Sequence, residues 1–145
     1  MRAVVWIVEE TWEATVDAAA ALLPPDAEIE LLHVRGEIEA VVAGGRRGLL
    51  GRHPPRAPDP VPAALDAAEE VLLTDAAARL GRHATASGRK GPAEHAVLDA
   101  AVHADVLVLA RDRDDAGPRS LGHATRFVVD HAPCDVLLVR GASAG

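Results

Sequence analysis

The side chains best suited to bind an anion lie in residues 110 to 123, which read ARDRDDAGPRSLGH. Arginine guanidinium groups bind phosphate oxygens as bidentate donors. Gly122 is expected to open a helix, and a helix start offers unpaired backbone N–H groups and the positive end of the helix dipole. Arg111, Arg113 and Arg119, placed around Gly122, therefore indicate a phosphate site.

Three aspartates in the same stretch oppose that interpretation. Asp112, Asp114 and Asp115 bring negative charge beside the helix start, and each close contact between like charges costs about 1 kcal/mol even at water-like permittivity. The arginines and aspartates can instead pair with one another at the surface. His123, in the first helical turn, either donates to a phosphate or is simply solvated, and both interpretations stay open.

Metal chemistry and nucleophilic catalysis find no support in the sequence. The histidines are dispersed, with no HExxH motif and no Cys/His cluster at zinc spacing. Ser120, His123 and Asp130 are close in sequence, but nothing supplies the strained turn of a nucleophile elbow, and we expect Ser120 to cap the helix. Neither a Walker A sequence nor GxGxxG occurs. No metal ion and no catalytic residue are therefore predicted.

The composition of the 145-residue chain fits one domain that extends from residue 1 to 145. A formal net charge of -7, with two tryptophans and one phenylalanine as the only aromatic residues, argues against nucleic acid and anionic membranes as partners. Cys134 is the single cysteine and cannot form an internal disulfide. Without a signal-peptide pattern or an apolar stretch of about 20 residues, the protein is expected to be cytoplasmic.

Short runs of β-branched and aliphatic residues alternate with helical patterns along the chain. Strands are expected at residues 3–8, 27–34, 84–87, 105–110 and 134–139, and helices at residues 11–23, 61–80, 92–104 and 122–132. This order predicts an α/β fold, a doubly wound five-stranded parallel sheet with helices on both faces. The weakly apolar strand 84–87 is expected at a sheet edge. Residues 36–60, rich in proline, glycine and arginine, are expected to form an irregular excursion.

The ligand crevice of such a sheet lies beyond the carboxyl ends of the strands, where the strand order reverses. Glu9 follows the first predicted strand, Val34 ends the second, and residues 110–121 follow the fourth. These three places are therefore where a functional site is expected.

Two segments of the chain, HADVLVLA and SLGHATRFVVDHAPCDVLLVR, resemble the universal stress protein family. In that family an ADLIVMG-like strand, a glycine-rich loop, LGS at a helix start and a closing HAPCPVLVV segment follow one another. The order of the amino-terminal elements also fits, so the resemblance covers the chain apart from residues 36–60. It implies a Rossmann-like, nucleotide-binding fold with strand order 3-2-1-4-5.

Many members of that family bind ATP through a loop of glycine, two residues, glycine, nine residues, glycine and then serine or threonine. In this chain Ala110 and Arg113 stand at the first two glycine positions, Gly122 at the third, and His123 at the hydroxyl position. The loop is also one residue short. The loss of two glycines removes backbone freedom that lets N–H groups approach phosphate.

The remaining positions of the family's nucleotide site are kept in part. The DGS that follows the family's first strand aligns with Glu9, Glu10 and Thr11, so a carboxylate and a hydroxyl are retained and the glycine is lost. Val34 aligns with the residue whose backbone usually meets the adenine. The resemblance therefore implies cofactor-binding positions at Glu9, Thr11, Val34, Ala110, Arg111, Arg113, Gly122 and His123.

The function expected from the resemblance is a non-enzymatic regulatory or protective role in stress response, with ATP binding lost or altered. Unidentified protein clients and a homodimer paired through the last strand, Cys134 to Val139, are the partners it implies. One alternative is an ATP sensor in which arginines replace the glycines and Glu9 or Asp112 holds Mg²⁺, with slow hydrolysis. A second alternative is an enzyme of the related adenine-nucleotide hydrolase-like group.

Overall fold

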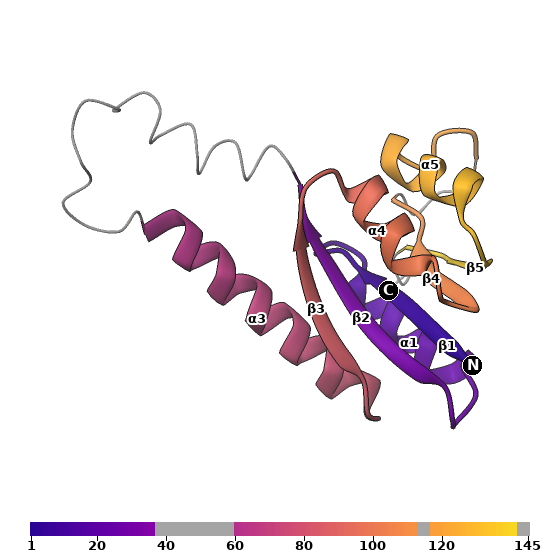
Figure 1. Cartoon of the computed structure of the whole chain (residues 1–145), viewed down its shortest axis with the longest axis horizontal. Coiled ribbons are helices and arrows are strands. Elements are labelled where there is room, and N and C mark those ends of the chain that lie inside the picture. Colours follow the sequence, from indigo (N-terminus) through magenta and orange to yellow (C-terminus); the bar gives the residue numbers. More distant parts are fainter. Residues whose placement is uncertain (37–59, 113–116, 142–145) are drawn as a thin grey trace.

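A five-stranded parallel sheet lies at the centre of the computed structural model, which describes residues 1–36, 60–112 and 117–141 (Figure 1). The strand order is β3-β2-β1-β4-β5. The strands are β1 (Arg2–Ile7), β2 (Glu28–Arg35), β3 (Thr85–Lys90), β4 (Val106–Ala110) and β5 (Asp135–Val139). Every pairing is parallel, so the strands all end at one side of the sheet. The order reverses between β1 and β4.

Helices cover both faces of this sheet (Figure 1). They are α1 (Trp12–Leu22), α3 (Pro60–Leu80), α4 (Ala93–Ala101) and α5 (His123–His131). Residues of α1 and α3 share one apolar cluster with alternate residues of β1 and β2, whereas α4 and α5 pack on the opposite face. The doubly wound α/β fold predicted from the sequence, including its strand order, is therefore confirmed.

The central position of β1 in the sheet explains why residues 3–7 are all apolar and do not alternate with polar residues. Ala3, Val5 and Ile7 point into the cluster with α1 and α3, while Val4 and Trp6 point into the cluster with α4 and α5, and all five are buried. A strand between two helical layers has no solvent face, so it tolerates no polar position.

The predicted elements agree with the structure to within one to three residues at most ends. The weak strand predicted at residues 84–87 is present as β3, extends to Lys90, and lies at the sheet edge as expected. The predicted excursion at residues 36–60 lies almost entirely outside the described residues. The prediction that residues 1–145 form a single domain stays a prediction for the same reason.

Thr11 occupies the position before α1, but its side chain makes no capping hydrogen bond. Its hydroxyl therefore does not cap the helix. The Thr11 carbonyl instead accepts a bond of 3.0 Å from the hydroxyl of Thr15, which is fully buried. The backbone of Thr11 is held by its own N–H, which donates to the Val8 carbonyl at 3.1 Å.

Candidate functional site

The start of α5, where a phosphate site was expected, is occupied by a carboxylate from the chain itself. The Gly122 N–H donates to the Asp112 carboxylate, and the hydroxyl of Thr125 donates to its second oxygen at 3.1 Å. Thr125 is buried, which fixes the direction of its hydroxyl. Asp112 therefore supplies the anion that the unpaired N–H groups and the dipole of a helix start attract.

Arg111 and Ser120 join the two ends of the same loop. An Nη of Arg111 donates to the Ser120 hydroxyl at 2.6 Å, and that hydroxyl donates to the Gly117 carbonyl at 3.0 Å. The Asp112 N–H also donates to the Ser120 carbonyl at 3.0 Å. The prediction that Ser120 caps α5 is wrong, because Asp112 takes that role and Ser120 is buried inside the loop.

The predicted ion pairing between arginines and aspartates is absent from the described part of this loop. Arg111 contacts Ser120 and Asp112 contacts the start of α5, so these two neighbours do not pair with each other. Arg119 and His123 are exposed. Arg113, with Asp114 and Asp115, lies outside the described residues.

Three further predicted positions lie at the carboxyl ends of the strands. Ala110 is the last residue of β4 and is paired with Val139. Val34 is half-buried on β2 and faces the layer of α4. Thr11 follows β1, and a Cβ built on Gly141 would lie 3.4 Å from its methyl group. Thr11 and the segment after β5 are therefore neighbours.

Glu9 belongs to a second group of polar residues, on the α3 side of the sheet, which the sequence analysis did not identify. His33 is 5% exposed and lies between two carboxylates: its Nε2 is 2.6 Å from Glu9 Oε1 and its Nδ1 is 2.6 Å from Glu69 Oε2. Both contacts are short enough that each has a proton between the nitrogen and the oxygen. Glu9 is thus bonded to His33 and not to any described residue of the loop before α5.

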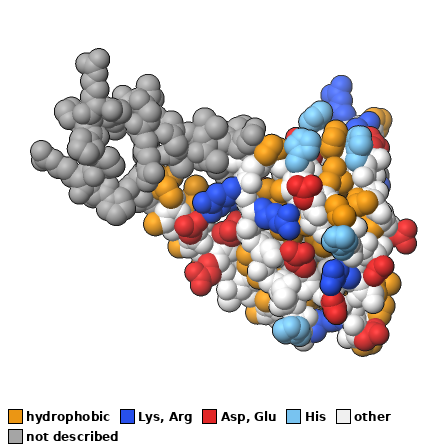
Figure 2. All heavy atoms as spheres, viewed as in Figure 1, with side chains coloured by type: hydrophobic (Ala, Val, Ile, Leu, Met, Phe, Trp, Pro, Cys, Tyr) orange, Lys and Arg blue, Asp and Glu red, His pale blue; other side chains and the backbone are white. Residues whose placement is uncertain are grey.

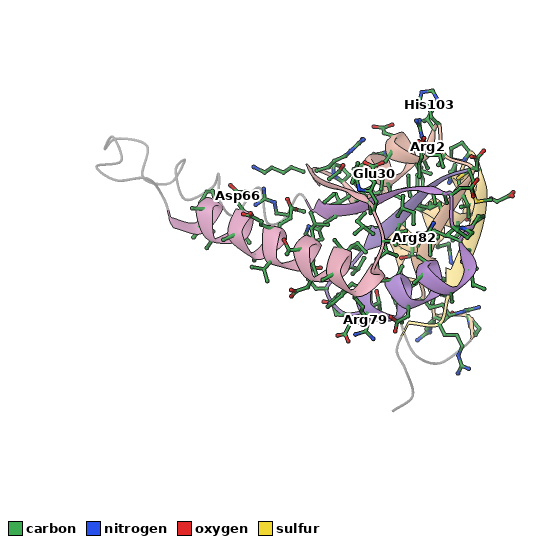
Figure 3. All side chains as sticks on the ribbon, turned by 90° about the horizontal axis from the view of Figure 1, so that it is seen from below. Arg2, Glu30, Asp66, Arg79, Arg82 and His103 are labelled. Carbon is green, nitrogen blue, oxygen red and sulfur yellow. The ribbon has the colours of Figure 1, made fainter. Side chains whose placement is uncertain are left out.

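Arg35 extends this group toward the start of α3. Its Nη2 lies 2.5 Å from Asp66 Oδ1, and its Nε lies 3.6 Å from Glu69 Oε2. Figure 3 places Asp66 near the amino-terminal end of α3. We call Glu9, His33, Arg35, Asp66 and Glu69 the α3 polar cluster.

Gly88 on β3 makes room for this cluster. Gly88 is paired with His33 across the sheet, and a Cβ at position 88 would overlap the Glu69 carboxylate. The side chain of Glu69 is only 14% exposed. The sequence signals for the cluster are weak: a histidine in β2 and a glycine in the neighbouring strand β3. Asp66 and Glu69 come from α3, which is distant from β2 in the chain.

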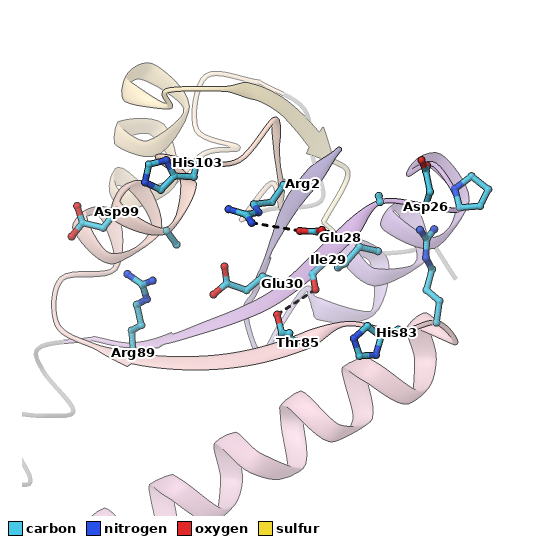
Figure 4. Close-up of a pocket in the computed structure, with 14 residues that line it drawn as sticks. Arg2, Asp26, Glu28, Ile29, Glu30, His83, Thr85, Arg89, Asp99 and His103 are labelled. Atoms are coloured by element: carbon cyan, nitrogen blue, oxygen red, sulfur yellow. Dashed lines mark hydrogen bonds and ion pairs between the residues drawn. The ribbon is translucent and has the colours of Figure 1, made fainter.

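A larger cavity, of about 750 Å³, lies elsewhere in the fold and contains none of the predicted site residues (Figure 4). It is bordered by the starts of β1 and β2, by β3 and by the second half of α4. Arg2 pairs with Glu28 at 3.5 Å there, while Arg89, Asp99 and His103 stand around the opening. Figure 2 shows acidic and basic side chains interspersed over the visible face of the described residues, with no patch of a single sign on that face.

The described residues contain no group of three side chains suited to hold a metal ion. Glu9 and Asp112 are the magnesium ligands expected for the ATP sensor. Glu9 is bonded to His33, and Asp112 is bonded to the Gly122 N–H. No helix in the described parts of the chain has both the length and the hydropathy to cross a membrane.

Comparison with known proteins identifies the fold. No protein-family profile matches the chain, and no curated protein matches its sequence significantly. A structure of the hypothetical protein MJ0577 is similar with a TM-score of 0.69 and 16% identity, over 99% of this chain and 97% of that chain. Universal stress protein UspA from Lactobacillus plantarum gives a TM-score of 0.63 and 21% identity, over 97% of each chain.

A third solved structure is a universal stress protein in complex with cAMP, with a TM-score of 0.64 and 18% identity over 98% of each chain. The chain therefore has the fold of the universal stress proteins. The resemblance stated from the sequence is confirmed at the level of the fold.

Proposed function

We propose that this protein is a universal stress protein-like domain with a regulatory or protective role, is cytoplasmic, is not an enzyme, and has lost the binding of ATP phosphates. The fold supports the first part of the proposal. The loss of phosphate binding is supported by one observation: the Asp112 carboxylate accepts the hydrogen bond of the Gly122 N–H at the start of α5.

A phosphate group can reach the start of α5 only by displacing the Asp112 carboxylate. Hydrogen bonds to a charged group each contribute about 1.5 to 3 kcal/mol, and 1.4 kcal/mol corresponds to a factor of ten in affinity. Losing the bonds from Gly122 and Thr125 therefore weakens phosphate binding by at least tenfold. If the carboxylate stays near, repulsion between like charges adds to this cost.

The alternative, an ATP-responsive sensor, is favoured by one observation on this chain and one on a similar structure. The guanidinium of Arg111 lies next to the α5 start, where it is held by Ser120. The universal stress protein solved with cAMP demonstrates that a protein of this fold can hold a nucleotide. In this alternative Arg111, Arg113 and Arg119 take the place of the missing glycines, with Mg²⁺ at Glu9 or Asp112 and slow hydrolysis.

Calorimetric titration with Mg-ATP at moderate salt separates the two functions. For the native protein we expect no saturable heat up to about 1 mM ATP, and for Asp112→Ala we expect binding that is at least tenfold tighter. Glu94→Ala, which removes an acid from the first turn of α4, is the matched control. Micromolar binding by the native protein would refute the proposal in favour of the sensor. If Asp112→Ala gains nothing, Asp112 is not what blocks the site.

We further propose a homodimer formed through β5. This strand lies at the sheet edge, and its apolar residues Val136 to Val139 are all only partly buried. An apolar strand edge is a template for pairing with another chain. Light scattering is expected to show a dimer for the native protein and a monomer for Leu138→Lys. Val102→Lys, at an apolar residue of α4's end that is 56% exposed, is expected to leave the dimer intact.

A further inference from the structure

A small cavity of about 140 Å³ adjoins the α3 polar cluster. It lies on the α3 side of the sheet, away from α5, so it is separate from the phosphate site discussed above. Its lining is partly charged and partly apolar: Glu9, His33, Arg35, Leu65, Ala68, Glu69 and Leu72.

One polar atom of a lining residue is buried without a hydrogen-bond partner among the described residues. Arg35 has a side chain that is 8% exposed, and its Nε makes no hydrogen bond to any described group. The nearest carboxylate oxygen, Oε2 of Glu69, lies 3.6 Å from it, beyond hydrogen-bond distance, and is held 2.6 Å from His33 Nδ1. Buried donors in native proteins almost always have an acceptor. The Arg35 Nε–H therefore indicates a place in the cavity for an acceptor that the described residues do not supply.

The charges around the cavity restrict what that acceptor can be. Glu9, Asp66 and Glu69 outnumber Arg35 and His33, so a carboxylate or phosphate ligand is repelled. An ammonium group carries no lone pair to accept from the Arg35 Nε–H. A hydroxyl meets both requirements, because it accepts from Nε–H with its oxygen and donates its own proton to a carboxylate. Glu9, whose side chain is 59% exposed, has a second oxygen with no bond among the described residues.

The apolar part of the lining and the volume restrict the rest of the ligand. Leu65, Ala68 and Leu72 form an apolar wall, which suits a short carbon skeleton. A cavity of this size accepts a compact molecule of about six heavy atoms. We propose that the cavity binds a small neutral polyol, with one hydroxyl between Arg35 and Glu9 and its carbons against α3. This inference does not depend on the proposed function.

NMR titration tests the proposal with glycerol as the probe, followed through the Arg35 Nε–H resonance. We expect a saturable shift with a Kd on the order of 1 to 10 mM, as suits so small a ligand. 1,2-Dimethoxyethane has the same number of heavy atoms and accepts hydrogen bonds but donates none, so it is expected to cause no saturable shift. A shift that grows linearly with glycerol means that water alone fills the cavity, and it would overturn the proposal.

Two variants test which side chains bind glycerol. Binding to them is followed through the backbone amide resonances of His33 and Gly88. Arg35→Lys keeps the positive charge but removes the Nε–H, and it is expected to weaken glycerol binding at least tenfold. Leu65→Phe fills the cavity without changing any charge, and it is expected to abolish saturation. Arg89→Lys, an exposed arginine on β3, is the control that leaves binding unchanged. Equal binding by Leu65→Phe and the native protein would also overturn the proposal.

Discussion

Placing a methyl group at position 88 is the most selective way to disturb the α3 polar cluster. In Gly88→Ala the new Cβ overlaps the carboxylate of Glu69. Glu69 cannot keep its present position, and its bond of 2.6 Å to His33 Nδ1 breaks or lengthens. The substitution therefore acts on a buried hydrogen bond without removing any of its atoms.

The expected magnitude follows from two opposing effects. Losing a buried hydrogen bond between ionisable partners costs about 1.5 to 3 kcal/mol. Replacing glycine by alanine in a strand returns about 0.5 to 1 kcal/mol, since the unfolded chain loses conformational freedom. The free energy of unfolding is thus expected to fall by about 1 to 2 kcal/mol, which lowers the melting temperature by roughly 3 to 8 °C for a domain of this size.

Urea denaturation followed by circular dichroism measures this loss, with Gly36→Ala as the control. A Cβ on Gly36 meets no described atom within 4 Å, so that substitution is expected not to lower the free energy of unfolding. A double-mutant cycle with Glu69→Ala identifies the cause, because Gly88→Ala should no longer destabilise when the carboxylate is gone. If the loss persists in the Glu69→Ala background, the overlap with Glu69 is not its origin and the reasoning is refuted.

Three further outcomes are expected. Asp112→Ala removes the cap of α5 and should lower the free energy of unfolding by about 1 kcal/mol in urea denaturation, whereas Glu94→Ala should not. Burial, together with two neighbouring aspartates, raises the pKa of the Cys134 thiol. Its alkylation should therefore be slower than that of a free thiol at neutral pH and should accelerate as the pH rises; an ordinary rate would contradict this. Hydrogen bonds from Arg79, at 2.8 Å, lower the pKa of Asp17. The stabilisation from this pair is present above the unfolded pKa and is lost as the pH falls through the folded one, so Arg79→Ala should return the NMR-monitored Asp17 titration to its usual range.

The fold could be predicted from the sequence because each element carries its own signal. The apolar run of β1 and the alternation of strands with helical patterns require a parallel sheet covered on both faces. The apolar pattern of β3 is weak for a physical reason: an edge strand buries little surface and needs few apolar residues. The exact ends of helices and strands carry a weaker signal, because caps depend on tertiary contacts. Thr11 illustrates this, since it precedes α1 but its hydroxyl makes no capping hydrogen bond.

The candidate site was predicted only in part, because side-chain partners are chosen in space. The sequence indicates that Asp112 lies near Gly122 and predicts that it repels a phosphate. The structure shows in addition that the Asp112 carboxylate accepts a hydrogen bond from the Gly122 N–H. Glu9 was assigned to the nucleotide crevice, and the structure bonds it to His33. Glu69 carried no signal, because a glutamate on an alanine-rich helix is ordinarily solvated, and only the packing of α3 on β2 brings it to His33.

Asp112 is proposed to hold the start of α5 against phosphate, and the Gly122 amide reports on this contact directly. In a proton–nitrogen NMR titration with Mg-ATP we expect the Gly122 resonance of the native protein to stay in place up to about 1 mM nucleotide. The same resonance should move on titration of Asp112→Ala. A saturable shift of Gly122 in the native protein at micromolar ATP would contradict the account and indicate that the nucleotide displaces Asp112.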